Sequence, residues 1–366
     1  MSPNTPPFRA DHVGSLLRPA ALHAARTARQ RGEITEEALK EIEDREIRAA
    51  IRKQEQIGLK AVTDGEYRRA MWHFDFLEGL DGVESFVPAQ GIQFSGGIAI
   101  PRAIRVVGKL GYSGHPMIDH FRFVQANTQV MPKMAIPSPS VLHFRGGRRS
   151  IDAKAYPDMA EFYRDLGDAY SKTVRAFADA GCRYLQLDEV NLTYLCDTEQ
   201  RRMLTERGDD PSKLPAIYAD MINCSIAGRP RDMTVAMHLC RGNFRSSWIA
   251  QGGYEPVAEL LFNSIDVDAY FMEYDSERAG GFEPLRFVPK HKHVVLGIMT
   301  SKSGTLETKD DLKRRIDAAT KFIPLDNLCL SPQCGFASTE EGNLLSEAEQ
   351  WAKLERVVEV AGEVWQ

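Results

Sequence analysis

Eight short apolar runs recur along this chain of 366 residues, and segments with helical periodicity lie between them. The runs end close to polar residues, as where Asp188 and Glu189 follow Tyr-Leu-Gln-Leu. Alternation of helix and strand implies parallel pairing with right-handed crossovers, and a closed parallel barrel needs eight strands. The sequence therefore predicts an α/β fold, a (β/α)8 TIM barrel, with strands at 12–16, 60–63, 134–142, 184–187, 235–239, 269–272, 294–298 and 328–330.

Two of the intervening helices show clear boundaries. Residues 35–57 begin with Thr35 as a helix-capping residue and stop at Gly58, and residues 157–180 open with a proline and stop at a glycine. Residues 82–133 interrupt the rhythm with many glycines and prolines, so we expect an insertion on the barrel near 82–133. A barrel of this length folds as one domain, and we therefore expect residues 1–366 to form a single domain.

Composition and charge exclude several classes of protein. The 46 basic and 51 acidic residues are spread along the chain, so no basic field indicates a nucleic-acid partner. We expect the densest basic segment, residues 144–149, to be a solvated loop. No apolar run reaches the ~20 residues of a membrane helix, and the N-terminus lacks a secretory signal. These features favour a cytoplasmic protein that binds neither membrane nor nucleic acid, and they are compatible with a homo-oligomer.

Residues that commonly bind metals stand at the ends of three predicted strands. His238 and Cys240 are two residues apart, so on an extended strand they point the same way, and Glu273 and Cys334 end or follow two other strands. Zinc accepts imidazole nitrogen and thiolate sulfur in tetrahedral geometry. A structural zinc normally uses cysteines two to four residues apart, and this chain has no such pair. The pattern favours a zinc ion that meets a substrate, and a purely structural zinc is the non-enzyme alternative.

Six cysteines in so long a chain are too sparse for a disulfide framework. Three of those outside the metal pattern are expected in the buried core: Cys182, Cys224 and Cys329.

The chain resembles the cobalamin-independent methionine synthases, specifically their C-terminal catalytic barrel. The motifs that carry the resemblance span nearly the whole chain: His-Val-Gly-Ser at 12–15, Thr-Asp-Gly-Glu at 63–66, Gln-Leu-Asp-Glu at 186–189, His-Leu-Cys at 238–240, Met-Glu-Tyr-Asp at 272–275 and Ser-Pro-Gln-Cys-Gly at 331–335. The resemblance implies that His238, Cys240, Glu273 and Cys334 bind zinc.

The resemblance also implies an amino-acid substrate and the residues that hold it. Glu66 and Asp188 match the family's catalytic and substrate-binding acids that hold the ammonium group, and Ser15 matches the residue near the carboxylate. Arg18 could serve an anionic end of the substrate, although an exposed position is expected for it.

Two departures from the family bear on the methyl donor. The chain is too short to contain the second, N-terminal barrel that helps long members to bind polyglutamylated folate. The family's Asp-Ile-His-Ser, whose histidine is implicated in protonating the folate leaving group, is here Ile-Met-Thr-Ser at 298–301. Thr300 cannot act as such an acid, so we expect slow turnover with methyl-folate.

The function expected from these features is zinc-dependent transfer of a methyl group to the thiol of homocysteine, a step of methionine biosynthesis. The donor can be folate, a methyl-corrinoid protein or another carrier. The alternative is alkyl or epoxide transfer to another small thiol such as coenzyme M, which carries no ammonium group to match Glu66 and Asp188. The uroporphyrinogen-decarboxylase-like methyltransferases also use His-x-Cys on a barrel, but they lack two of the motifs above.

Overall fold

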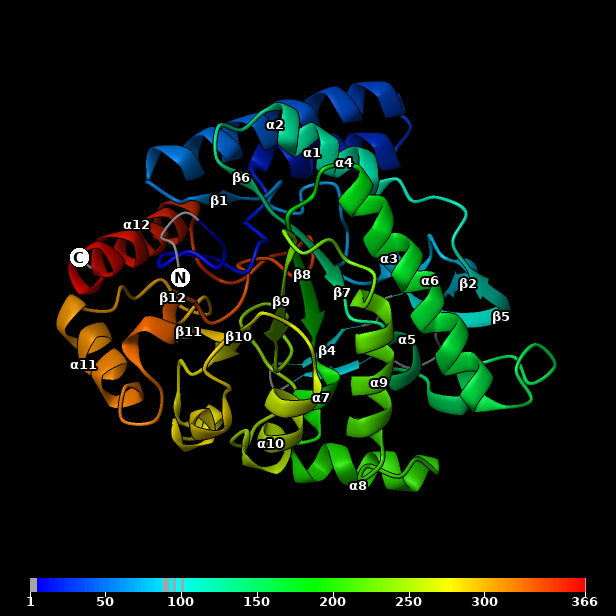
Figure 1. The fold of residues 1–366 in the computed structure, drawn as a ribbon. Coiled ribbons are helices and arrows are strands. Elements are labelled where there is room, and N and C mark those ends of the chain that lie inside the picture. The colour runs from blue at the N-terminus through cyan, green and yellow to red at the C-terminus, as the bar shows by residue number, and fades with distance from the viewer. Residues whose placement is uncertain (1–4, 88–91, 95–96, 100–101, 366) are drawn as a thin grey trace.

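The computed structural model describes residues 5–87, 92–94, 97–99 and 102–365. Six parallel strands form one sheet in the order β12-β11-β10-β9-β8-β7 (Figure 1). They are nearly continuous apolar runs that are buried on both faces, as expected of strands covered by helices. Their bounds are β7 Met134–Pro137, β8 Tyr184–Glu189, β9 Thr234–Leu239, β10 Ala269–Glu273, β11 His293–Met299 and β12 Leu328–Pro332.

Three further segments close this sheet into a barrel. The strand β6 (Met131–Pro132) leads after Lys133 into β7 and pairs in parallel with β1 (Ala61–Val62). The N-terminal segment lies between β1 and β12, because Ala10 forms a parallel bridge with Leu330 and the Leu16 amide donates to the Gly65 carbonyl at 3.0 Å. The predicted (β/α)8 barrel is confirmed.

Two of the predicted strand boundaries are wrong. Residues 12–16 form no strand, and Gly14 there has a φ of 139° that extended strands do not use. The run expected to reach residue 142 ends at Pro137, because Pro137 and Pro139 have no N–H for a ladder and the chain then enters a short helix.

Helices surround the sheet, as Figure 1 shows. The two helices predicted from the sequence are present, and Thr35 accepts a hydrogen bond from the Ala38 amide. Asp158 caps the second helix, so Pro157 precedes the cap and does not stand in the first turn as predicted. The helices are α1 Ala20–Gln30, α2 Glu36–Gln56, α3 Phe74–Leu77, α4 Met117–Ala126, α5 Ser140–Phe144, α6 Met159–Asp179, α7 Asn191–Tyr194, α8 Thr198–Arg207, α9 Leu214–Ile226, α10 Glu255–Ser264, α11 Lys309–Ala319 and α12 Glu347–Val364.

The insertion expected near 82–133 consists of two antiparallel pairs. The strand β2 (Asp81–Phe86) pairs with β5 (Ala103–Gly111), and β3 (Ile92–Phe94) pairs with β4 (Gly97–Ala99). The end of the expected range includes α4 and β6, and β6 pairs within the barrel. The extra structure is therefore shorter than the sequence pattern indicates.

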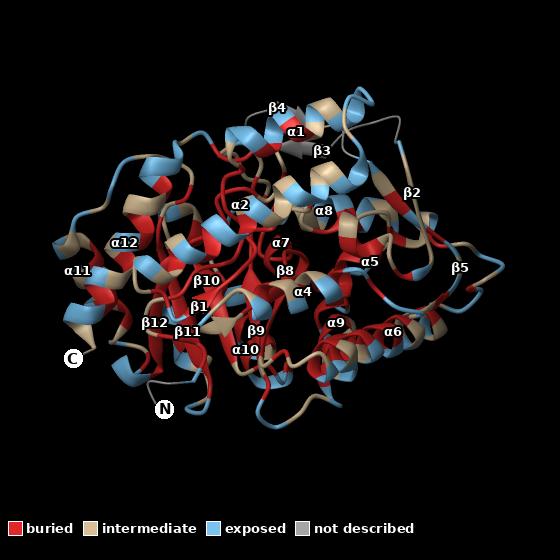
Figure 2. Cartoon of the chain, turned by 90° about the horizontal axis from the view of Figure 1, so that it is seen from above, coloured by how far each residue is buried: buried red, intermediate tan, exposed pale blue. Residues whose placement is uncertain are grey.

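Burial separates the barrel from its covering layer. Figure 2 shows buried residues along the strands and exposed residues on the outer helix faces. Cys182 and Cys329 are buried as predicted, but Cys224 is exposed, because it lies on an outward position of α9. Among the described residues, no helix combines the length and the apolar character needed to cross a membrane.

Candidate metal centre and substrate pocket

Four side chains from three strand ends meet at one point of the barrel. His238 lies in β9 and Cys240 directly after it, Glu273 ends β10, and Cys334 follows β12. One donor atom from each lies within 4.8 Å of all the others, and the two Sγ atoms are 3.6 Å apart. All four are buried. The structure therefore brings together the complete set that the sequence predicts as metal ligands.

The donor set suits zinc, which takes imidazole nitrogen, thiolate sulfur and carboxylate oxygen. Neither ring nitrogen of His238 has a hydrogen-bond partner among the described residues, which is unusual for a buried imidazole. The hydrogen bond between the two thiols holds the pKa of Cys334 well below its usual range and raises that of Cys240. One thiolate is thus favoured in the protein alone, and a cation would be needed to stabilise both.

The carboxylate of Glu273 is held from two directions. Its Oε1 accepts a hydrogen bond from the Arg241 amide at 3.1 Å, and its Oε2 accepts one from Arg278 Nη2 at 3.0 Å. Burial is the largest cause that raises the pKa of Glu273, and Arg278 opposes it. The carboxylate is therefore oriented before any ligand binds.

Two acids line the pocket that the cysteines also line. Glu66 adopts a left-handed backbone conformation with φ 61°, a strained conformation for this residue type, and its Oε2 has no partner among the described residues. Burial raises the pKa of Glu66 to about 7, although Arg69, 3.7 Å away, opposes the rise. Burial also raises the pKa of Asp188 to about 6.

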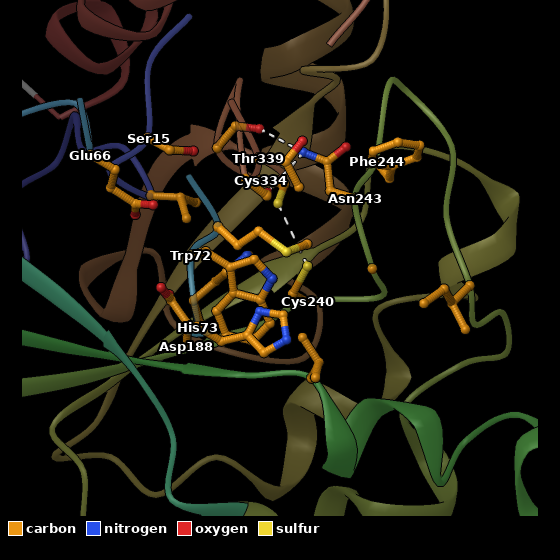
Figure 3. A pocket seen from close by; sticks show the side chains of 18 of the residues that line it. Ser15, Glu66, Trp72, His73, Asp188, Cys240, Asn243, Phe244, Cys334 and Thr339 are labelled. Atoms are coloured by element: carbon orange, nitrogen blue, oxygen red, sulfur yellow. Dashed lines mark hydrogen bonds between the residues drawn. The ribbon is translucent and has the colours of Figure 1, made fainter. Parts of the chain in front are cut away.

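Ser15 lies in the same pocket, as Figure 3 shows. Its Oγ accepts a hydrogen bond from the Ala337 amide at 3.3 Å. A Cβ atom at Gly335 would lie 1.9 Å from Ser15 Oγ. Glycine at this position therefore allows the Ser-Pro-Gln-Cys-Gly segment to lie close to the His-Val-Gly-Ser segment. The three predicted substrate-binding residues, Ser15, Glu66 and Asp188, are therefore in one pocket with Cys240 and Cys334.

Several residues of this pocket were not predicted from the sequence, and Trp72, His73 and Arg145 are three of them. Figure 3 shows Trp72 and His73 directed into it. A bridge between Met71 and Thr339, and a 2.9 Å hydrogen bond from the Trp72 amide to Ser338, hold their segment in place. Arg145, from the basic segment expected to be a solvated loop, also lines the pocket. The aromatic cluster Trp-His-Phe at 72–74, which begins six positions after Glu66, was the available signal for the first two.

His73 is buried, and neither of its ring nitrogens has a partner among the described residues. Burial, with a smaller effect of Arg145, holds the pKa of His73 well below its usual value. Its imidazole is therefore neutral near pH 7 and has one N–H and one lone pair free for a ligand.

The positions of Arg18 and Thr300 bear on two other expectations. Arg18 is buried rather than exposed, because its guanidinium donates to the carbonyl oxygens of Leu16, Ala337, Glu66 and Arg69. Thr300 is not among the described residues that line the pocket, and its amide donates to Glu307 Oε1 at 2.8 Å.

Comparison with known proteins gives a consistent set of matches. The family described as "Cobalamin-independent synthase, Catalytic domain" matches residues 8–363. The uncharacterized Bacillus subtilis (strain 168) protein YxjH is 51% identical over 361 residues, which cover 98% of this chain and 95% of that protein. A Pyrococcus abyssi methionine synthase is 24% identical over 327 residues, 88% of this chain and 84% of that protein. The solved structure of a Listeria monocytogenes protein assigned as a vitamin-B12-independent methionine synthase is 40% identical, with a TM-score of 0.80 and 99% of both chains covered.

Proposed function

We propose that this chain, which belongs to the cobalamin-independent methionine synthase family, transfers a methyl group to the thiol of homocysteine and so forms methionine. The class of reaction is that of the family, thiol S-methyl transfer. One observation carries the choice of acceptor. Three members of the four-donor cluster, His238, Cys240 and Cys334, line the same pocket as a pair of buried acids suited to an ammonium group. We further propose that residues 1–366 act as a single catalytic domain.

Zinc is the metal that we assign to His238, Cys240, Glu273 and Cys334, because the set contains two sulfurs, one imidazole and one carboxylate. When bound there, zinc lowers the pKa of a substrate thiol, so that the nucleophilic thiolate is present at neutral pH.

Glu66 and Asp188 position the other end of the acceptor. Two carboxylates buried in one pocket favour a cationic partner, and the free Oε2 of Glu66 is an acceptor that an α-ammonium group can fill. The hydroxyl of Ser15, which lines the same pocket, then suits the substrate carboxylate. Fixing both ends of the substrate holds its sulfur in one place, and such positioning contributes more to the rate than the gain in thiolate alone.

The experiment is isothermal titration of the zinc-loaded protein with homocysteine, coenzyme M and glutathione. We expect homocysteine to bind most tightly, and Asp188→Asn to weaken homocysteine while leaving coenzyme M almost unchanged. Tightest binding of coenzyme M would favour the alternative, alkyl transfer to a sulfonate thiol. Failure of all three thiols to bind the zinc-loaded protein would indicate a structural zinc.

A further inference from the structure

Arg278 lies between two buried carboxylates at the edge of the metal cluster. Its Nη2 donates to Glu273 Oε2 at 3.0 Å and to Asp275 Oδ1 at 2.8 Å. All three side chains are at least nine-tenths buried. The guanidinium carbon is 5.1 Å from the centroid of the Trp248 ring, and Nη1 has no hydrogen-bond partner among the described residues. One guanidinium nitrogen is therefore shared between a candidate metal ligand and a second acid.

Glu273 can interact with Arg278 and with a metal at the same time, but each interaction weakens the other. An ionised carboxylate has about four acceptor positions, and the Arg241 amide and Arg278 take two of them. Charge-assisted hydrogen bonds are strong, and they are stronger in a buried site of low dielectric. A carboxylate whose charge is already matched by a guanidinium is a poorer ligand for a cation than a free one.

We infer that Arg278 is a positioning residue that keeps Glu273 a weak and exchangeable member of the metal cluster, so that the substrate thiol can take its place. This inference rests on the proposed function. A carboxylate that left the metal without a partner would be a buried unpaired charge, which is strongly unfavourable. Arg278 removes that obstacle, because the displaced carboxylate keeps an ion pair throughout.

Asp275 sets the strength of this effect. It competes with Glu273 for the same Nη2 atom, so it reduces the hold of Arg278 on Glu273. Removing Arg278 should therefore strengthen the bond of Glu273 to zinc, whereas removing the charge of Asp275 should weaken it. The direct Coulomb effects of the two charges on a cation have these same two signs, so a comparison in a Glu273→Gln background is needed to separate them from an effect that acts through Glu273.

The test measures zinc affinity by competition with a chromophoric chelator, in the full chain. Removing a partner that orients a metal-binding group typically costs roughly 10- to 100-fold in metal affinity. For Arg278 we expect a change of that size but of opposite sign, because Arg278 competes with the metal for the Glu273 carboxylate. We expect Arg278→Met to bind zinc about tenfold more tightly than the wild type and Asp275→Asn to bind it several-fold more weakly. At full zinc occupancy, homocysteine should bind about tenfold more weakly to Arg278→Met and no more weakly to Asp275→Asn.

A double-mutant comparison identifies the residue through which Arg278 acts. In a Glu273→Gln background, Arg278→Met should no longer change zinc or homocysteine affinity. Should Arg278→Met fail to fold, Arg278→Lys, which keeps the charge but not the shared planar contact, should shift zinc affinity in the same direction by less. Shifts of both Arg278→Met and Asp275→Asn in the same direction, or an effect that persists in the Glu273→Gln background, would overturn the inference. A wild type that binds zinc but not homocysteine would instead contradict the proposed function, and the zinc measurements would still decide the role of Arg278.

Discussion

Replacing Glu66 with glutamine should stabilise the ligand-free protein while weakening its substrate binding. Glu66 is buried, and burial raises its pKa from 4.5 to about 7. A difference of about 2.5 in pKa, at about 1.4 kcal/mol for each pKa unit, is about 3 kcal/mol. This is the free energy by which folding disfavours the ionised form of Glu66.

The sign of the pH dependence follows from this difference. Between pH 4.5 and about 7 the folded protein holds more protons at Glu66 than the unfolded chain does, so stability falls as the pH rises through this window. Glutamine has nearly the same shape and no charge. Glu66→Gln should therefore match the wild type near pH 4.5 and exceed its free energy of unfolding by up to about 3 kcal/mol above pH 7.

Urea unfolding followed by tryptophan fluorescence, at pH values from 5 to 8 and constant zinc occupancy, measures the effect. Glu41→Gln is the matched control, because Glu41 is an exposed glutamate on α2. The same Glu66→Gln protein should lose roughly 1.5–3 kcal/mol of homocysteine binding, the range for a hydrogen bond to a charged group. Parallel stability curves for the wild type and Glu66→Gln across this pH range would refute the assignment of a raised pKa to Glu66.

Three further predictions concern the metal, the pocket wall and the donor. Purified protein should hold close to one zinc ion per chain, and Cys334→Ser should lose most of it by elemental analysis; full retention in both Cys240→Ser and Cys334→Ser would contradict the zinc assignment. His73→Phe should leave the melting temperature unchanged or raise it, because it removes an unsatisfied buried imidazole. The same variant should lower the rate of methyl transfer without loss of zinc, and unchanged turnover would show that no substrate contacts His73. Methyltetrahydrofolate should support slow turnover or none, while methylcobalamin methylates homocysteine readily. The folate leaving group needs a proton, but Thr300 lies outside the pocket lining and His73 is neutral. Rapid methionine formation from methyltetrahydrofolate would show that another residue supplies this proton.

The barrel and the metal cluster were predictable because both depend on local periodicity. His238 is the second-last residue of β9, Glu273 ends β10, and Cys334 follows the end of β12 by two residues. Parallel strands bring these ends to one edge of the barrel, so the three side chains were expected near each other. The position of Arg278 was not predictable in this way. It follows Glu273 by five residues and lies in the short 3-10 turn Glu277–Ala279, and no periodic pattern determines where a side chain of such a connecting turn points.

Contacts between distant parts of the chain account for the other differences. The Trp72 amide reaches the Ser338 carbonyl, and residues so far apart have no shared spacing that a sequence reveals. Arg145 was expected in solvent because it belongs to a basic segment, yet the turn after α5 directs it into the pocket. Cys224 was expected in the core because free cysteines are usually buried, and this tendency of a residue type could not identify its outward position on α9.

The pocket concentrates polar groups that the protein leaves without partners. More than nine in ten buried polar groups in folded proteins are hydrogen-bonded, so several orphaned atoms in one place need an explanation. Here Glu66 Oε2 and both ring nitrogens of His73 and His238 are buried without partners among the described residues, and all three side chains line one pocket. Each of the three needs a different partner. A cation suits Glu66, a metal suits His238 beside the two thiols, and a hydrogen-bonding ligand suits His73. An ammonium-bearing thiol and a zinc ion would satisfy the first two, which leaves His73 as the group available to a second substrate.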